Sequence, residues 1–440
     1  MVGKTLVKQS KLMKNGALAS VLFLFSSFIS AQTYYVDASK GNDNNSGTSI
    51  LVPWQSLDKV SNQQFYPGDN ILFKAGEQWT GSLTLSSSGA KDLPITYGSY
   101  GDLQNFGKPY INGNGKIYNH TGEAKNESII IFAKNKEFIH LENLKVSADS
   151  FDVTGIKSTT GIYFGSDIKR QLSGFKLTNV TVQDVFQSKI DDPKRFNKKG
   201  KRIRVSKGKS FAVRFQSKYP TDRNARFNNI LVENSTITNN QREGLRFIGA
   251  DNIVIRNNTF YKNGGSAAVV NNYYDLTFEN NDCQYSGAGE STGDDIRMHN
   301  RGSSLWTVFG EKALVRNNTF KHSRGWLDSY GMHVDHNNKD VIVEKNYFED
   351  NEGGFIQIIG DNQDITYRYN VSVNDGLDLN QNNRTASTIH FSDYVGQDKK
   401  TGKKKPGTPP ALRFITTRFI YRQMLKIFQQ TLNYVRVKHI

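Results

Sequence analysis

A short stretch in the last third of the chain, WLDSYGMHVDHNN at positions 326–338, brings carboxylate and imidazole groups close together. His333 and Asp335 are two residues apart, so on an extended strand both side chains lie on the same face. A second stretch, DDIRMHN at positions 294–300, repeats this combination of residue types. Such groups transfer protons or bind metals, and they also occur as polar decoration on structural repeats.

Hydrolysis of a glycosidic bond is the chemistry that fits two such acidic stretches. One carboxylic acid protonates the leaving oxygen while a carboxylate activates water or attacks the sugar, and the two groups lie about 5 to 9.5 Å apart. Two neighbouring strands would place carboxylates at that separation. A zinc site is an alternative, but it would need a third ligand such as His299, and we predict no metal site with these histidines. The predicted catalytic residues are Asp294, Asp295, His333 and Asp335.

Internal repeats identify the elements that must position these groups. Asn234, Asn257 and Asn280 are 23 residues apart, and Asn346 and Asn370 are 24 residues apart. Each repeat holds an alternating apolar segment, an Asn, a second short strand and a Gly-containing turn. Short alternating strands bury their apolar face only when successive coils stack, with three strands and three turns per coil. The sequence therefore predicts an all-β solenoid, a single-stranded parallel β-helix whose Asn side chains bond backbone groups at the bends.

Two successive repeats are longer than the others. Asn280 and Asn317 are 37 residues apart, and Asn317 and Asn346 are 29 residues apart. Insertions on one face of a solenoid usually build its binding surface. Both acidic stretches lie in these insertions and follow a Gly turn. We therefore expect the strands at 294–299 and 332–336 to be stacked neighbours in one sheet.

Strand alternation predicts which side chains face outward from that sheet. Ile296 and Met298 point inward in the first stretch, and Met332 and Val334 point inward in the second. The outward residues of successive coils, about 4.8 Å apart, would form a ladder that spans several sugar units. Exposed aromatic rings beside the ladder would stack on sugar faces. The predicted substrate-binding residues are Arg214, Arg246, Arg297, His299, Trp326, Tyr330, Gln357 and His390.

β-Elimination on a polymer that contains uronic acid is the alternative reaction. The sugar carboxylate must be neutralised by Arg or Ca²⁺ so that a base can remove the adjacent C5 proton. Arg246 and Arg297 could neutralise it, and His333 could be the base. Calcium is expected only for such a lyase, because hydrolysis requires no cofactor. Its candidate ligands are Asp294, Asp328, Asp350 and Glu352.

A third interpretation is a non-catalytic glycan-binding protein, in which the ladder binds a polysaccharide without cutting it. In all three interpretations the partner is a polysaccharide, with no nucleic acid and no membrane, and the chain is expected to be a monomer. Residues 194–209 contain nine basic residues and no acidic one. This segment could attract an anionic polymer, although a solvated basic loop is the simpler interpretation.

Charge and hydropathy divide the chain into three parts. Residues 1–31 have four lysines followed by an apolar run that ends at Ala31, the layout of a signal peptide, so we expect a secreted or periplasmic protein. Residues 399–440 carry eleven basic residues and no acid, and we hypothesise that this atypical tail is a frameshift product. A basic amphipathic helix is the alternative. The remaining 42 basic and 41 acidic residues, at 32–398, nearly cancel, and this part is predicted to be one β-helix domain.

The N-terminal region resembles a known family. The stretches YYVDASKGNDNNSGTSILVPWQSLDKV, PGDNILFKAGEQWTGSLTLSSSGAKDLPITYGSYG and KPYINGNG are similar to the opening of secreted bacterial right-handed parallel β-helix proteins of the pectate-lyase-like superfamily. The resemblance covers residues 33–395 and implies a right-handed coil with an N-terminal cap. This superfamily includes polysaccharide lyases, glycoside hydrolases and proteins without activity. The Gly-Asp-Asp at 293–295 is also similar to an element of polygalacturonases, whose Asn-Thr-Asp and Arg-Ile-Lys elements this chain lacks.

Overall fold

The structure is a computed structural model. It describes residues 30–120, 123, 127–148, 158–186, 209–287, 302–325, 328–377, 387–397, 404–407 and 412–420. Apart from Ser30, these residues belong to one compact unit, Ala31–Ile440. Within them, no helix is both long and apolar enough to cross a membrane.

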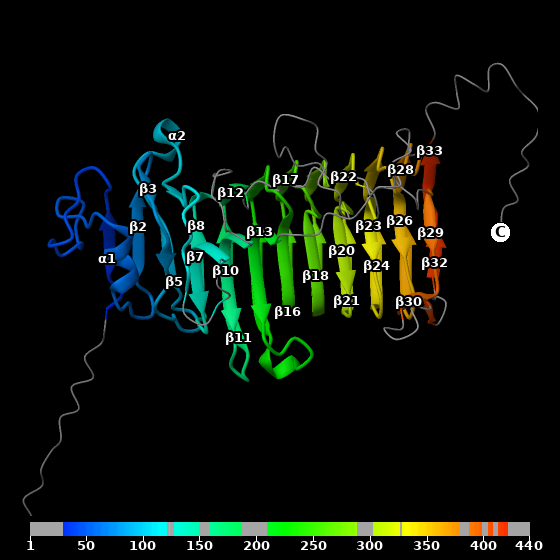
Figure 1. The fold of residues 1–440 in the computed structure, drawn as a ribbon, viewed down its shortest axis with the longest axis horizontal. Coiled ribbons are helices and arrows are strands. Elements are labelled where there is room, and N and C mark those ends of the chain that lie inside the picture. Colours follow the sequence, from blue (N-terminus) through cyan, green and yellow to red (C-terminus); the bar gives the residue numbers. More distant parts are fainter. Residues whose placement is uncertain are drawn as a thin grey trace, which may run out of the picture. The chain divides into compact units, whose positions relative to one another are not determined.

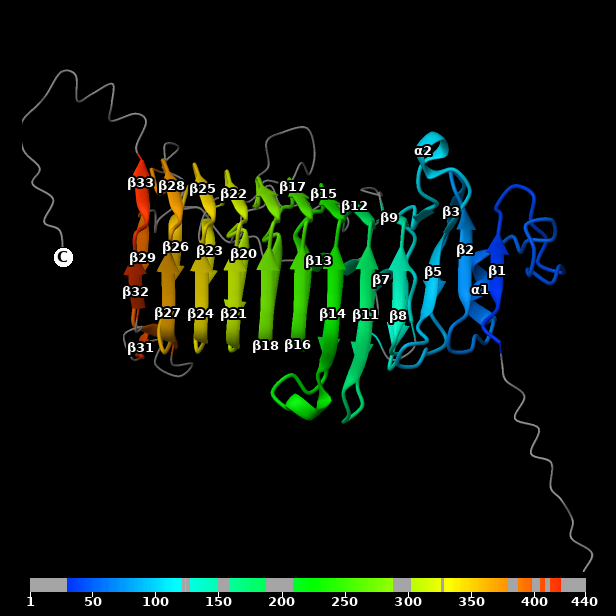
Figure 2. The same ribbon diagram turned by 180° about the vertical axis from the view of Figure 1, so that it is seen from behind.

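The chain forms a parallel β-helix in which each full coil contributes a strand to three faces (Figures 1 and 2). The two figures show the strands stacked side by side in chain order, from β1 in blue to β33 in red. The first face, which carries the predicted ladder, is built from β4 (Leu83–Thr84), β7 (Glu127–Lys134), β10 (Ser158–Ser166), β13 (Lys209–Ser217), the first halves of β16 (Glu243–Arg256) and β18 (Ala268–Glu279), β20 (Leu305–Val308), β23 (Tyr330–Val334), β26 (Gly354–Ile358) and β29 (Ile389–Phe391).

The second face begins with the N-terminal strand of the described chain. It contains β1 (Thr33–Val36), β2 (Asn70–Lys74), β5 (Ile95–Tyr100), β8 (Ile139–Glu142), β11 (Leu172–Thr178), β14 (Phe227–Glu233), the second halves of β16 and β18, β21 (Glu311–Arg316), β24 (Lys339–Glu344), β27 (Gln363–Arg368) and β32 (Leu412–Ile415).

The third face is made of short strands. They are β3 (Gln78–Thr80), β6 (Tyr110–Asn112), β9 (Lys145–Ala148), β12 (Thr181–Val185), β15 (Thr236–Thr238), β17 (Thr259–Tyr261), β19 (Asp282–Gln284), β22 (Thr319–Lys321), β25 (Tyr347–Glu349), β28 (Val371–Val373) and β33 (Arg418–Ile420).

Few elements lie outside these faces. Helix α1 (Leu57–Asn62) begins at Ser56, whose side chain accepts a hydrogen bond from the Lys59 N–H, and two further short helices are α2 (Leu103–Phe106) and η1 (Arg223–Ala225). Strands β30 (Tyr394–Gln397) and β31 (Lys404–Pro406) form an antiparallel hairpin. The tail is not separate from the coils, because β32 and β33 pair with β27 and β28. The alternating apolar residues of 412–420 are sufficient to form these two strands, and the frameshift remains a hypothesis about the gene.

Apolar residues at alternate positions fill the interior of the coils. The rings of Phe164, Phe215 and Phe247 stack on one another with centroid distances of 4.6 and 5.2 Å. All three side chains are almost completely buried. Burial of each such ring stabilises the fold by about 1.5–3 kcal/mol. The predicted parallel β-helix is therefore confirmed, together with the three strands per coil.

Asparagines connect the coils at one bend, as predicted. The asparagine ladder consists of Asn258, Asn281, Asn318, Asn346 and Asn370. From Asn281 onward, each side-chain oxygen accepts hydrogen bonds from the backbone N–H and the Nδ2 of the Asn one coil earlier. Each of the first four Nδ2 groups also donates to a backbone carbonyl of a neighbouring coil. The residue before each of these asparagines has a φ of 55° or 56°, a left-handed conformation that Asn tolerates well.

Candidate functional site

One row of outward side chains runs across the first face. The strand register aligns Arg214, Arg246, Val269, Trp306, His333, Gln357 and His390 on successive coils. We call this row the ladder. Five of its members are residues that alternation predicted for this position. Their alignment is as expected, and their contribution to substrate binding stays a prediction.

The strand next to β23 differs from the prediction. We expected residues 294–299 to be the stacked neighbour of 332–336, whereas β23 pairs with β20 and β26. The stretch LWTVFG at 305–310 repeats the pattern of LRFIG at 245–249, with an inward first residue and a closing Gly. The side chain of Leu305 is fully buried, as an inward residue requires. Trp306 therefore occupies the ladder position that we had assigned to Arg297.

Several predicted site residues lie outside the described part of the chain, namely Asp294, Asp295, Arg297, His299 and Trp326. The segment that carries the first four starts after Gly287 and ends before Gly302. Those two glycines lie so close that a Cβ added to Gly287 would be 2.8 Å from the Cα of Gly302. The described chain thus ends at Gly287 and resumes at Gly302 at nearly the same place, immediately before β20, the strand that pairs with β23.

An open pocket of about 320 Å³ lies over the middle of the ladder. Its residues come from the ends of the first-face strands and from the turns beside them. Two carboxylates, two arginines, one imidazole and two large aromatic rings line it, which suits a sugar with many hydroxyl groups. The lining residues are Arg242, Glu243, Arg246, Gly265, Ser266, Val269, Asn271, Trp306, Val308, Phe309, Asp335 and His336.

Asp335 has the most constrained carboxylate in this pocket, with only 9% of the residue exposed. The indole Nε1–H of Trp306 donates to its Oδ2 at 2.9 Å. Its Oδ1 accepts the His336 backbone N–H at 2.8 Å and lies 3.2 Å from His336 Nε2. Among the described residues, neither arginine nor lysine forms an ion pair with Asp335. The carboxylate is thus oriented by two donors without being neutralised by a permanent cation.

His333 supports this arrangement from one side. Its ring stacks on the Trp306 indole, with 4.6 Å between ring centroids and an angle of 25°. Only 2% of His333 is exposed, and it does not line the pocket. His333 therefore contacts Trp306, the residue that holds Asp335. It is not placed to contact a substrate in this pocket.

The two ladder arginines are engaged with carboxylates. Arg214 forms an ion pair with Glu127 at 2.7 Å, and both side chains are almost buried. Arg246 forms an ion pair with Glu243 at 3.0 Å, and this pair is more open to the pocket. The guanidinium of Arg214 also lies over the ring of Tyr163, 5.2 Å from its centroid. Of the two arginines, Arg246 is therefore the one placed to contact a ligand.

Three other predicted substrate-binding residues differ in exposure. Tyr330 is fully buried, so the prediction that its ring stacks on a sugar is wrong. Its ring is tilted against that of His390, with 6.2 Å between the ring centroids and 50° between the ring planes. Gln357 is 4% exposed, and His390 is partly exposed.

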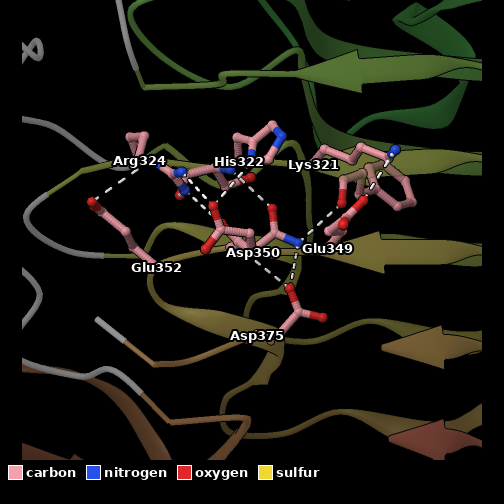
Figure 3. A network of polar contacts seen from close by, with 10 residues as sticks. Lys321, His322, Arg324, Glu349, Asp350, Glu352 and Asp375 are labelled. Carbon is pink, nitrogen blue, oxygen red and sulfur yellow. Dashed lines mark hydrogen bonds and ion pairs between the residues drawn. The ribbon is translucent and has the colours of Figure 1, made fainter. Parts of the chain in front are cut away.

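The residues considered for calcium have other partners (Figure 3). Asp350 accepts hydrogen bonds from His322 at 3.0 Å and Arg324 at 2.7 Å. Burial raises the pKa of Asp350, but these two donors outweigh it and hold the pKa below its ordinary value. Glu352 accepts the Gly325 N–H at 3.2 Å and lies 3.8 Å from Arg324. Asp350 and Glu352 thus already have cationic or hydrogen-bonding protein partners in the place where a calcium ion would bind.

Asp328 is the third calcium candidate among the described residues, and its backbone carbonyl oxygen accepts a hydrogen bond from Ser303. Throughout the described residues, no group of three or more His, Cys, Asp or Glu side chains is arranged to hold a metal ion.

Several pocket residues escaped the sequence analysis. Arg242 and Phe309 lie in turns, while Glu243 is the first residue of β16 and His336 the last residue of the strand predicted at 332–336. Alternation does not reliably orient side chains in turns or at strand ends. The closing Gly249, Gly310 and Gly360 would have aligned the three strands and shown that Trp306 belongs to the ladder.

Comparisons with known proteins agree with this fold. The Beta_helix family model, described as right handed beta helix region, matches residues 224–292. A lacto-N-biosidase from Bifidobacterium longum subsp. longum is 24% identical over an alignment that covers 86% of this chain. The chain spans 28% of the length of that relative.

Solved structures show the same likeness. The native crystal structure of a GH136 lacto-N-biosidase from Eubacterium ramulus has a TM-score of 0.64 and 20% identity, covering 88% of this chain and 68% of that one. A rhamnogalacturonan lyase has a TM-score of 0.54 and 14% identity, covering 87% of this chain and 96% of that one. At these identities the structural likeness establishes the fold, a right-handed parallel β-helix.

Proposed function

We propose that the protein is a glycan-degrading enzyme that hydrolyses a glycosidic bond in the pocket over the ladder, with Asp335 as a catalytic carboxylate. The observation that carries this proposal is the geometry of Asp335, which is held by Trp306 and His336 at the wall of an open pocket. A fixed carboxylate beside a binding pocket is what base or nucleophilic catalysis requires. The sequence similarity to a lacto-N-biosidase supports a glycosidase.

The second carboxylate is proposed to be Asp294 or Asp295. Glu243 also lines the pocket, but its strand β16 is separated from β23 by β18 and β20. Three strand spacings amount to about 14 Å, which exceeds the separation of a catalytic pair. In the sequence, Asp294 and Asp295 lie between Gly287 and Gly302, and Gly302 precedes β20, the strand that pairs with β23. Glu243, paired with Arg246, is assigned to substrate binding.

The substrate is proposed to be an oligosaccharide or polysaccharide, and an anionic one is compatible with the pocket. Arg242 and Arg246 both line it, and the charge of Arg246 is offset by Glu243. These two guanidinium groups also favour a second candidate function, β-elimination on a uronic-acid polymer, in which they would neutralise the sugar carboxylate. The same fold in a rhamnogalacturonan lyase is compatible with this chemistry.

A substrate panel tests the two reactions. Purified protein is incubated with the oligosaccharides that lacto-N-biosidases cleave, and with alginate, pectin, glycosaminoglycans and algal polysaccharides. We expect new reducing ends without absorbance near 235 nm. Unsaturated products that absorb near 235 nm would show that the reaction is β-elimination and not hydrolysis. Binding without any product would identify a non-catalytic glycan-binding protein and would overturn the proposal.

We further propose that the protein is exported and acts as a monomer outside the cytoplasm. The lysine-rich start and the apolar run that ends at Ala31 support export. Amino-terminal sequencing of the protein from its native host should place the mature start close to Gln32. A retained leader, or recovery of the protein only from the cytoplasm, would contradict this proposal.

A further inference from the structure

A second open pocket, of about 300 Å³, borders the first. We call it the corner pocket, because it lies where the chain turns from the first face to the second, between β20 and β21 and between β23 and β24. Phe309 lines both pockets and is 44% exposed. The Phe309 and His336 rings lie 6.4 Å apart, so the two pockets meet beside Asp335.

Basic side chains dominate the lining of the corner pocket. Arg223, Arg226 and Lys339 line it, against a single acidic residue, Glu311. The charge of Arg226 is already used, because its guanidinium forms a buried ion pair with Asp251 at 2.9 Å. The basic groups open to a ligand are thus Arg223 and Lys339.

Arg223 is held in place while remaining accessible. Its guanidinium lies 3.8 Å from the ring centroid of Tyr274, and its Nε is 3.9 Å from Asp251. The side chain is nevertheless 53% exposed. Lys339 is exposed and, among the described residues, forms no ion pair. A planar guanidinium stacked on an aromatic ring still presents its outer N–H groups to an oxyanion.

We propose that the corner pocket binds an acidic substituent, a sulfate ester or a carboxylate, on a sugar next to the one cleaved beside Asp335. This inference rests on the proposed function, because it places two parts of one glycan in adjoining pockets. The exposed ring of Phe309 would contact the sugar that connects them. Arg223 and Lys339 would bind the oxyanion with charge-assisted hydrogen bonds.

Three methyl glycosides that differ only at C6 provide the binding test, namely methyl β-galactoside, its 6-sulfate and methyl β-galacturonoside. Their affinities are measured by saturation-transfer NMR at low salt, where exposed charges are least screened. We expect at least one charged glycoside to bind about fivefold or more tightly than the neutral one, since exposed ionic contacts contribute modestly. Sulfate and carboxylate are distinguished by which of the two binds. Equal affinities for all three would overturn the proposal.

Two single substitutions locate the binding. Lys339→Gln changes an exposed side chain and should not affect folding, and Arg223→Gln tests the stacked guanidinium. Each substitution should weaken binding of the charged glycoside about fivefold or more. Lys312→Gln is the matched control, because Lys312 pairs with Asp275 near Tyr274 but does not line the pocket. Parental affinity in either folded test variant, or the same loss in the control, would overturn the proposal.

A variant at the catalytic carboxylate separates this inference from the proposed function. Asp335→Asn should bind the charged glycoside with parental affinity, because Asp335 does not line the corner pocket. Absence of turnover with every glycan, together with intact anion binding, would reject the enzyme and retain the anion site. Turnover without selective anion binding would retain the enzyme and reject the anion site.

Discussion

At the scale of single residues, Asp335 combines burial with orientation. Both of its oxygens accept hydrogen bonds from the protein, one from the Trp306 indole and the other from the His336 backbone. Neither donor carries a permanent charge. Among the described residues, the Asp335 carboxylate is therefore not paired with an Arg or Lys, unlike Glu127, which is paired with Arg214.

The first prediction concerns Asp335→Asn. The amide keeps the shape but cannot act as a nucleophile or general base, so turnover should fall by about 100-fold or more. Either the Trp306 indole N–H or the His336 backbone N–H then loses a good acceptor. This should lower the free energy of unfolding by roughly 1–3 kcal/mol and leave the coil folded. Turnover on the best glycan of the panel and the thermal unfolding midpoint are the measurements. Asp340→Asn, an exposed position in β24 of the same coil, is the control and should retain parental turnover.

The second prediction tests whether Trp306 acts through Asp335. Trp306→Phe keeps a ring against His333 but removes the N–H that donates to Asp335 at 2.9 Å, so turnover should fall by roughly tenfold. The Trp306→Phe/Asp335→Asn double variant should be no slower than Asp335→Asn alone, because the indole has no carboxylate left to orient. Fully additive losses in rate would show that Trp306 acts on the substrate by itself.

At the scale of elements, the asparagine ladder fixes the register between coils. Asn318 donates to the Phe278 carbonyl and to Asn346, and it accepts the Asn281 N–H and Nδ2. Each bond joins different coils, so the asparagine ladder aligns the bends between the second and third faces, and the first-face strands follow after the short third-face strands. The position of β23 and of Asp335 depends on this alignment.

The third prediction is a loss of stability in Asn318→Ala. The substitution removes the acceptor of the buried Asn281 N–H and Nδ2 and the Nδ2 that donates to the Phe278 carbonyl and to Asn346, whose oxygen keeps only the backbone N–H of residue 318. It should lower the free energy of unfolding by about 2–4 kcal/mol. Chemical denaturation measures it. Asn317→Asp is the neighbouring control, because this exposed residue has a left-handed φ of 55° that Asp also tolerates, and its effect should stay within about 0.5 kcal/mol. Equal effects at both positions would contradict a specific role of the asparagine ladder.

The fourth prediction concerns an aspartate that stands where a bend would otherwise hold an asparagine. Asp375 is fully buried and accepts hydrogen bonds from the backbone and the side chain of Asn351 (Figure 3). Burial raises its pKa to about 7. The unfolded carboxyl loses its proton near pH 4, so only the folded state holds the proton between about pH 4 and pH 7. Stability should therefore be greatest at low pH and fall as the pH rises through this window.

Asp375→Asn measures this contribution directly. The amide oxygen can accept both bonds from Asn351, and the amide nitrogen can donate to Ser372, which now contacts the carboxyl at 2.5 Å. Chemical denaturation should show that the parent loses on the order of 2–4 kcal/mol of unfolding free energy between pH 5 and pH 8. The variant should not show this loss. The same pH dependence in parent and variant would assign it to other groups.

At the scale of the whole molecule, stacking brings together residues that are distant in sequence. The pocket combines strand and turn residues from the coils of β16, β18, β20 and β23, and each coil contributes between two and four of the lining residues. Within the described residues the fold is held by apolar stacking and asparagine bonds, and Cys283, the single cysteine of the chain, is a buried free thiol. The carboxylate-based hydrolysis proposed above requires no metal ion.

The fifth prediction follows from that chemistry. Dialysis against EDTA should change turnover by less than about twofold, because carboxylate-based hydrolysis proceeds without a cation. Turnover is measured before dialysis, after it, and after Ca²⁺ is added back. Activity that disappears with EDTA and returns with Ca²⁺ would contradict hydrolysis and favour the calcium-dependent lyase.

The sequence by itself determined the architecture and the row on which the site is built. The repeat length of 23 or 24 residues and the strict alternation of apolar residues leave stacking as the way to bury the apolar face. Alternation also orients a side chain relative to its immediate neighbours. For this reason Arg214, Arg246, His333, Gln357 and His390 could be assigned to one outward row before the register was known.

Only the tertiary structure decided what surrounds Asp335. An insertion interrupts the repeat in the sequence, and the register of the coils shows that Leu305 opens the strand that pairs with β23. Burial of Tyr330 and the meeting of Trp306 with Asp335 likewise depend on contacts between coils. Local alternation carries no information about such contacts, because residues far apart in the chain become neighbours only when the coils are stacked.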